Sequence, residues 1–201
     1  MTGQECAEIL ASQAATQKFL QREDAQELIE NGDFESLYYL AYAQEFPFVG
    51  QLHWLFEYAG INPFEYLNDW LPLDYFYQDP CIRKIKIPGK FKAIGKLCFA
   101  ESALKSIEFE EGVENIASGA LHRCSALTEV ILPVSIRPLY SYSFKGCELL
   151  KEVKYRGDVN TARINVLSRS DVFADSSVTK VICADGELEI KNGKVYKIIR
   201  Y

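Results

Sequence analysis

The sequence predicts an α+β protein in which an N-terminal all-helical domain, residues 1–80, precedes a short repeat solenoid, residues 81–201, that ends in a β-hairpin cap. Three observations indicate this division. Apolar residues recur with a period of 22 or 23 residues in the C-terminal part. An Asn-Gly dipeptide lies between two alternating segments near the C-terminus. Sixteen of the 26 aromatic residues fall in residues 1–80, where this period is absent.

The repeats start near residues 82, 104, 127, 150 and 178. Counted from each of the first three starts, apolar residues occupy offsets 3, 5, 9, 12 and 17. They are Ile85, Ile87, Phe91, Ile94 and Phe99 in the first copy, Ile107, Phe109, Val113, Ile116 and Leu121 in the second, and Val130, Leu132, Ile136, Leu139 and Phe144 in the third. A period in the twenties predicts a solenoid whose units bury apolar surface only against their neighbours.

A small residue closes each of these copies at offset 20: Ser102, Cys124 and Cys147. Pro88 follows an Ile-Lys-Ile segment in the first copy, as Pro133 follows Val-Ile-Leu in the third. The resulting pattern, I-x-I-P-x-x-F-x-x-I-G-x-x-C-F-x-x-S, resembles the BspA-like class of leucine-rich repeats over residues 81–185. The resemblance implies that each copy forms a short strand followed by a compact return segment, which the small or Cys residue closes.

The fourth copy is longer than the others, because its aromatic residue, Phe173, arrives six residues late. We expect the extra length, residues 163–171, to form a loop. A last strand follows at Val178. The alternating sequence around Asn192–Gly193 predicts a hairpin over residues 187–199, since Asn-Gly tolerates positive φ at both centres of a type I′ turn. This hairpin is expected to cap the open end of the solenoid.

Helix start and stop signals divide the N-terminal part. Gly32 is expected to end one helix and Asp33 to cap the start of the next. Gly60 and Asn62–Pro63 mark a second boundary of the same kind. These signals predict four or five short helices, followed by an irregular connector over residues 71–80. The many aromatic rings allow so small a bundle to bury a sufficient core.

The net charge of −6 combines two opposed halves. Residues 1–80 hold 14 Asp or Glu against two bases, whereas residues 81–201 hold 14 acids against 20 bases. Six of these bases lie between Arg83 and Lys96 with no acid among them. The acidic domain could neutralise this basic first repeat, or each surface could recognise a partner. Direct nucleic-acid binding is not expected, because the acidic domain would repel a polyanion.

The sequence carries no motif for catalysis, for a cofactor or for a metal: it has no P-loop, no dinucleotide glycine fingerprint, no G-x-S-x-G and no H-E-x-x-H. The position of Cys124 in its repeat predicts that its side chain points inward and packs as a small hydrophobic residue. A nucleophile built from Cys124 and His122 is therefore disfavoured. We therefore expect no enzymatic activity. No signal peptide or membrane-spanning stretch is visible, so we expect a cytoplasmic protein. Many members of the family that it resembles are instead secreted or surface-attached.

Strand alternation places two rows of side chains on the outer face of the solenoid. The first row is Lys84, Ser106, Glu129, Glu152 and Lys180, and the second is Lys86, Glu108, Ile131, Lys154 and Ile182. Mixed charges around exposed isoleucines fit a protein-binding patch, although an ordinary solvated sheet face could have the same composition. We therefore expect a non-catalytic module that binds a protein through this face, through the acidic helical domain, or through both. The oligomeric state stays open.

The alternative is an inhibitor from a phage or mobile element. In this hypothesis an acidic surface that includes Glu27, Glu30 and Glu35 presents phosphate-like charge and blocks a nucleic-acid-handling host defence enzyme, as an anti-CRISPR-like decoy.

Overall fold

The computed structural model describes residues 14–15, 17–33, 36–37, 39–40, 67–80, 82–169 and 171–201. The chain forms two compact units, Met1–Leu67 and Asn68–Tyr201. The second unit thus begins before residue 81, where the sequence analysis starts the solenoid.

Helix α2 spans Glu23–Glu30 in the first unit. The chain leaves the helix at Asn31 and Gly32, and Gly32 takes the left-handed φ of 68° that suits a glycine after a helix end. The carboxylate of Asp33 then accepts a hydrogen bond of 3.0 Å from the Ser36 N–H, which is the expected capping contact. The boundaries predicted at Gly60 and Asn62–Pro63 lie outside the described residues.

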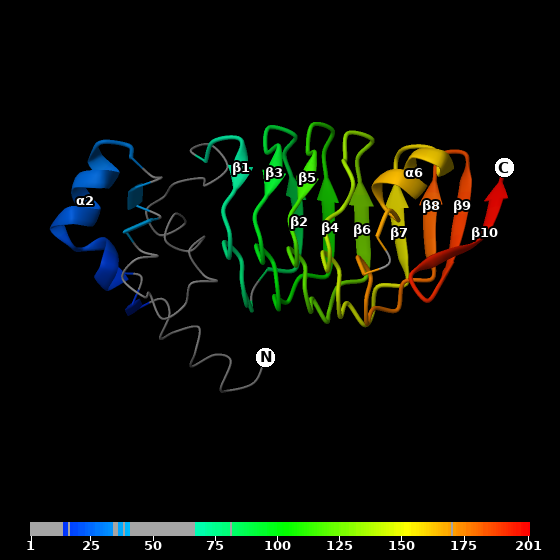
Figure 1. The fold of residues 1–201 in the computed structure, drawn as a ribbon. Helices are drawn as coiled ribbons and strands as arrows, with labels where there is room; N and C mark the ends of the chain where they lie inside the picture. Colours follow the sequence, from blue (N-terminus) through cyan, green and yellow to red (C-terminus); the bar gives the residue numbers. More distant parts are fainter. Residues whose placement is uncertain are drawn as a thin grey trace. The chain divides into compact units, whose positions relative to one another are not determined.

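Seven strands form the main sheet of the second unit, in the order β10-β9-β8-β7-β6-β4-β2 (Figure 1). Five of them run parallel, one from each successive coil of the solenoid. They are β2 Lys84–Ile87, β4 Ser106–Phe109, β6 Glu129–Leu132, β7 Glu152–Tyr155 and β8 Lys180–Cys183. Each lies at the start of a predicted repeat, so the repeat spacing is confirmed.

The C-terminal hairpin is also confirmed. Strands β9, Gly186–Lys191, and β10, Lys194–Arg200, pair antiparallel. The turn residues between them, Asn192 and Gly193, have φ of 54° and 70°, as a type I′ turn requires. Strand β9 also pairs antiparallel with β8, so the hairpin covers the edge of the last parallel strand.

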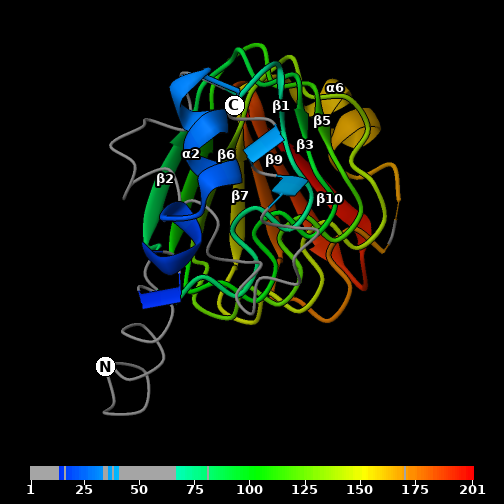
Figure 2. The ribbon, with the colours of Figure 1, turned by 90° about the vertical axis from the view of Figure 1, so that its left-hand side faces the viewer.

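A second, smaller sheet was not expected from the sequence. It has three parallel strands of two residues each: β1 Trp70–Leu71, β3 Ala93–Ile94 and β5 Asn115–Ile116. Figure 2 views the coils end-on, with β2 on the left and β3 and β5 on the right, so that the two sheets lie on different sides of the coil. Two residues are too few to show an alternating pattern, which is why the sequence did not reveal these strands.

The connector predicted over residues 71–80 is wrong, because this segment is part of the solenoid. Leu71 pairs with Ile94 in the smaller sheet. The N–H of Phe76 donates to the carbonyl of Cys98 at 2.6 Å, and the N–H of Phe99 donates to the carbonyl of Ala120 in the same way between the next two coils. Stacked Phe76 and Phe99 rings, with centroids 4.9 Å apart, add apolar contact between their two coils.

The loop predicted over residues 163–171 is wrong in its first part. Helix α6 spans Val159–Asn165, so the first residues of the predicted loop, 163–165, are helical. The Asp158 carboxylate caps the helix, accepting hydrogen bonds from the N–H groups of Asn160 and Thr161. Buried Val159 and Ala162 attach the helix to the core. Tertiary packing of these apolar residues stabilises a helix this short, which would not form alone.

The core of the solenoid consists of the phased apolar residues. All 15 positions of the first three copies are buried except Ile85, which is half-buried on the outermost parallel strand, β2. Phe91, Phe99, Phe109 and Phe144 are among the largest fully buried side chains. The inward register of the strands is therefore confirmed.

The small residues that close each copy stack in the interior, as predicted. The Cys124 thiol donates to the carbonyl of Phe99 at 3.0 Å, and the Cys147 thiol donates to that of Leu121 at 3.2 Å. Ser102 lies 3.8 Å from the Cys124 sulfur at the head of the same stack. Each thiol thus binds a carbonyl of the preceding coil, which a purely apolar side chain could not do.

We expect the four described cysteines, Cys98, Cys124, Cys147 and Cys183, to resist a maleimide probe in the native protein, because all four are free and buried. Burial raises the pKa of Cys124 to about 12 and that of Cys183 to about 11, so the reactive thiolate is scarce at neutral pH. In denaturant all six cysteines of the chain should react, as counted by mass spectrometry. Only four labelled cysteines would establish a disulfide and argue against a reducing compartment.

The same pKa shifts predict how stability depends on pH. The thiols ionise near pH 9 in the unfolded chain but at higher pH in the folded one. Stability should therefore be unaffected by these groups below about pH 8.5 and should fall as the pH rises above it.

Candidate protein-binding surface

The strand pairings place the two predicted outer rows in register. Lys84 pairs with Ser106 and Ser106 with Glu129, and Glu152 pairs with Lys180. The second row runs across the five parallel strands through Lys86, Glu108, Ile131, Lys154 and Ile182. We call these ten residues the outer face. Its geometry is confirmed, whereas its role in binding stays a prediction.

Ion pairs link the outer face near β2. The Lys86 ammonium lies 3.1 Å from the Glu110 carboxylate and 3.6 Å from that of Glu108. Arg156, just after β7, donates to Glu108 at 2.6 Å across the intervening strand. The hydrogen bond to Glu110 and the two nearby carboxylates raise the pKa of Lys86. The positive charge of Lys86, in the basic first repeat, is thus neutralised by acids of the second repeat.

A second set of contacts surrounds Glu129. Its carboxylate accepts hydrogen bonds from Lys154 at 2.9 Å and from the Ser106 hydroxyl at 3.0 Å, and these contacts lower its pKa. Further along, the Lys180 ammonium lies 3.3 Å from Glu187 of β9. Because the ammonium groups of these pairs are solvated, the pairs contribute little to stability. Their main effect is to set the order of charges that the face presents.

Ile131 lies at the centre of this charged arrangement. It pairs with Glu108 on one side and with Lys154 on the other, and Glu129 is the next outer residue on its own strand. Its side chain is half-buried by these neighbours. Ile182, also half-buried, lies one strand beyond Lys154 in the same row. The outer face therefore has an apolar centre with a charged rim.

Further residues, which the sequence pattern did not indicate, extend the outer face. Glu189 of β9 pairs with Lys180 of β8 on one side and with Lys197 of β10 on the other. In the same way, Glu187 of β9 pairs with Ile182 of β8 and with Ile199 of β10. Arg156 was also missed, because it follows the strand rather than lying in a row. Counting outward from the Asn192–Gly193 turn would give only the first pairs of the hairpin, because the register shifts between Val195 and Lys197 and places Glu189 opposite Lys197 instead of Tyr196.

Two of the three residues proposed for the acidic surface are described. Glu27 and Glu30 lie on α2, and both are exposed. Glu35 lies outside the described residues.

Comparison with protein families matches residues 71–194 to the BspA type leucine rich repeat region, in six copies. This match covers more than half of the chain. The chain belongs to the BspA type leucine-rich repeat family. The match begins at residue 71, which agrees with the coil that starts at β1. No curated protein and no solved structure matches the chain.

The leucine-rich repeats hold Cys124 in a state unsuited to nucleophilic attack. Its thiol is buried and hydrogen-bonded, and its pKa is raised to about 12, first of all by burial. His122, two residues before it, is half-buried, and burial together with Arg123 and Lys145 lowers its pKa. The pair therefore lacks the exposed thiolate that covalent catalysis needs.

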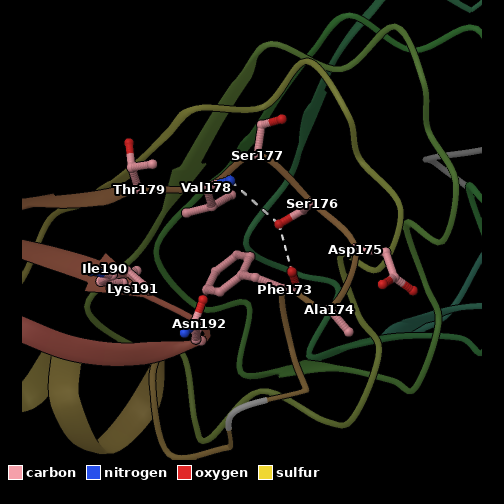
Figure 3. Close-up of a pocket in the computed structure, with 11 residues that line it drawn as sticks. Phe173, Ala174, Asp175, Ser176, Ser177, Val178, Thr179, Ile190, Lys191 and Asn192 are labelled. Atoms are coloured by element: carbon pink, nitrogen blue, oxygen red, sulfur yellow. Dashed lines mark hydrogen bonds between the residues drawn. The ribbon is translucent and has the colours of Figure 1, made fainter.

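A shallow pocket lies between the closing segment of the fourth coil and the hairpin turn (Figure 3). Ser176 organises one side, since its hydroxyl donates to the Phe173 carbonyl at 2.6 Å and accepts from the Val178 N–H at 3.4 Å. Lys191 and Asn192 line the opposite side. The Ser176 hydroxyl thus makes both of its hydrogen bonds to backbone groups of neighbouring residues, which indicates a structural role.

Among the described residues, no group of three or more His, Cys, Asp or Glu side chains gathers as a metal site. No helix in the same part of the chain is long and apolar enough to cross a membrane.

Proposed function

We propose that this leucine-rich repeat protein is a non-catalytic module that binds a protein partner through the outer face of its main sheet. The observation that carries the proposal is the position of Ile131, an apolar centre within a rim of Glu108, Glu129, Lys154 and Arg156. Leucine-rich repeats commonly serve as protein-interaction modules, which supports the same conclusion.

The physical properties of the face suit a protein surface better than other ligands. Protein interfaces combine an apolar core with a polar rim, and the charges of the rim set specificity and association rate. Because both rows mix acids with bases, a polyanion would meet repulsion at Glu108, Glu129 and Glu152. The side chains stand on hydrogen-bonded strands, so little backbone ordering is needed on binding. The partner that fits is a protein with an exposed apolar patch flanked by charges of both signs.

Ile131→Asp should weaken partner binding by about ten-fold or more, because it places a charge at the apolar centre of the interface. The partner is first captured from a lysate of the producing organism and identified by mass spectrometry, after which its Kd is measured by calorimetry. Because Ile131 is only half-buried, the Tm should change little.

Leu149→Asp is the matched control, since Leu149 is 55 % exposed in a turn outside the outer face. It should leave the Kd unchanged. Equal Kd values for Ile131→Asp and the unmodified protein would show that the partner binds elsewhere.

The acidic N-terminal part supports a second candidate, the inhibitor that imitates nucleic acid. Residues 1–80 hold 14 acids against two bases, and Glu27 and Glu30 are exposed. The same complex separates the two candidates. A decoy complex should weaken steeply with salt and compete with nucleic acid for the target, and the Glu27→Gln/Glu30→Gln variant should bind less. A salt-insensitive complex that Ile131→Asp disrupts would favour the outer face.

A further inference from the structure

Strand β10 ends the main sheet, and within the described part of the chain one of its edges has no partner strand. Among the described residues it pairs with β9 alone. The N–H of Tyr201 donates to the Asp185 carbonyl at 3.1 Å, across the same pair of strands. Because hydrogen bonding alternates along an antiparallel pair, the backbone groups of Ile199 also face β9, and those of Ile198 and Arg200 face away. We call the side that faces away from β9 the free edge.

Apolar side chains lie beside this free edge. Tyr196 and Ile198 of β10 are 70 % and 40 % exposed, and Ile164 of α6 is 64 % exposed. Ile164, Leu167 and Val195 line one shallow pocket, so the apolar surfaces of α6 and β10 are continuous. An added strand would therefore bury apolar area as well as satisfy backbone hydrogen bonds.

The charges of β10 specify what such a strand must carry. Lys194, Lys197 and Arg200 are its charged residues, and none is acidic. Arg200 already contacts Asp185 and Asn160. Within the described ranges, Lys194 and Lys197 form no ion pair. Across the sheet, Lys180 of β8 pairs with Glu189 of β9, which pairs with Lys197. The sign alternates from strand to strand, so an acid is the complementary residue opposite Lys197.

A second copy of the chain does not fit the free edge. Two β10 strands side by side would bring basic residues against basic residues with no acid between them. The register irregularity between Val195 and Lys197 further disrupts a regular ladder of two identical strands. Lysines and bulges of this kind are how natural edge strands avoid pairing with their own copies.

We propose that the free edge of β10 binds an extended acidic segment of a protein partner, which joins the main sheet as a further strand. Backbone hydrogen bonds to Ile198 and Arg200 would supply affinity, and acids opposite Lys197 would supply specificity. Alternate apolar residues of the segment would pack on Ile198, Tyr196 and Ile164. This site lies at the edge of the sheet and is independent of the outer-face proposal.

The test measures fluorescence anisotropy of a labelled peptide about as long as β10, in which glutamate alternates with valine. It should bind at about 1 mM or below. The matched peptide with lysine in place of glutamate should bind about ten-fold more weakly. A glutamate peptide methylated on the backbone nitrogens that would face β10 should lose binding to a similar extent, because strand addition needs those donors.

Lys197→Glu should reverse the preference, so that the lysine peptide binds better than the glutamate peptide. Lys105→Glu, an equal charge change at an exposed lysine directly before β4, should not. Ile131→Asp should leave peptide binding intact, which separates a failure here from a failure of the outer-face proposal.

Three results would overturn the edge proposal. They are no glutamate-peptide binding at about 1 mM, equal binding of the methylated peptide, and an unchanged preference in a folded Lys197→Glu protein. A dimer of the unmodified protein that the glutamate peptide dissociates would show that the occupant is a second copy, and would overturn it as well.

Discussion

Replacing Gly112 by alanine is expected to destabilise the solenoid by about 3–5 kcal/mol, a large part of the stability of a typical domain. Two effects add at this position. The φ of Gly112 is 110°, a conformation that L side chains rarely adopt. A Cβ there would also lie 2.4 Å from the carbonyl oxygen of Gly89, in the preceding coil. Neither the backbone oxygen nor the turn can move without separating the two coils.

Urea denaturation of the full chain measures this effect. Gly119→Ala is the matched control, because Gly119 also has positive φ, 67°, but the atom nearest to its Cβ would belong to the flexible side chain of Leu97, at 3.0 Å. It should cost about 1–2 kcal/mol. Gly89→Ala should again be severe, since its Cβ would lie 1.9 Å from the Glu111 carbonyl oxygen. Similar small losses for all three variants would mean that the coils are not in close backbone contact.

Ile107→Ala is expected to destabilise the protein by about 2–5 kcal/mol, through lost burial and the cavity left behind. Ile107 is fully buried in β4 between the parallel strands β2 and β6. Neighbouring coils provide its contacts, so collapse around the cavity would have to move several strands at once. Leu132→Ala in β6 should behave alike, because Leu132 is also fully buried.

Glu108→Ala, one residue further along the same strand, is the control for the strand register. Glu108 faces outward, and its contacts with Lys86 and Arg156 are exposed ion pairs that contribute little. Its loss should stay below about 1 kcal/mol. Equal destabilisation by Glu108→Ala and Ile107→Ala would contradict the inward and outward assignment of β4.

Local patterns were enough to predict the parallel strands and the hairpin. Each strand alternates inward apolar residues, such as Ile107 and Phe109, with outward residues that are mostly polar, and the same phase returns in the next coil. Because each coil of a solenoid contacts mainly its neighbours, this short-range pattern also determines which strands pair. The rows through Ile131 could therefore be predicted in register. The Asn192–Gly193 turn was predictable for a similar reason, since its conformation depends on two adjacent residues.

The features that depend on contacts between coils could be found only in the tertiary structure. The strand Trp70–Leu71 is too short to show a pattern, and it exists because Ala93–Ile94 offers backbone partners. Helix α6 forms because its apolar residues Val159 and Ala162 are buried in the core, a tertiary contact that its short sequence does not reveal. The contact of Arg156 with Glu108 spans 48 residues of sequence.

Residues with left-handed backbone conformation are another feature that the sequence alone could not predict. Gln78, Glu101, Arg123, Gly146 and Asp175 occupy successive coils, and all five have positive φ. Only one of them is a glycine, so the residue type does not reveal the turn. The stacked backbone hydrogen bonds of adjacent coils, such as that from the Glu101 N–H to the His122 carbonyl, impose the conformation on whichever residue is present. The sequence by itself thus determined the repeat and its inward face, whereas the packing of coil on coil decided the return path of the chain.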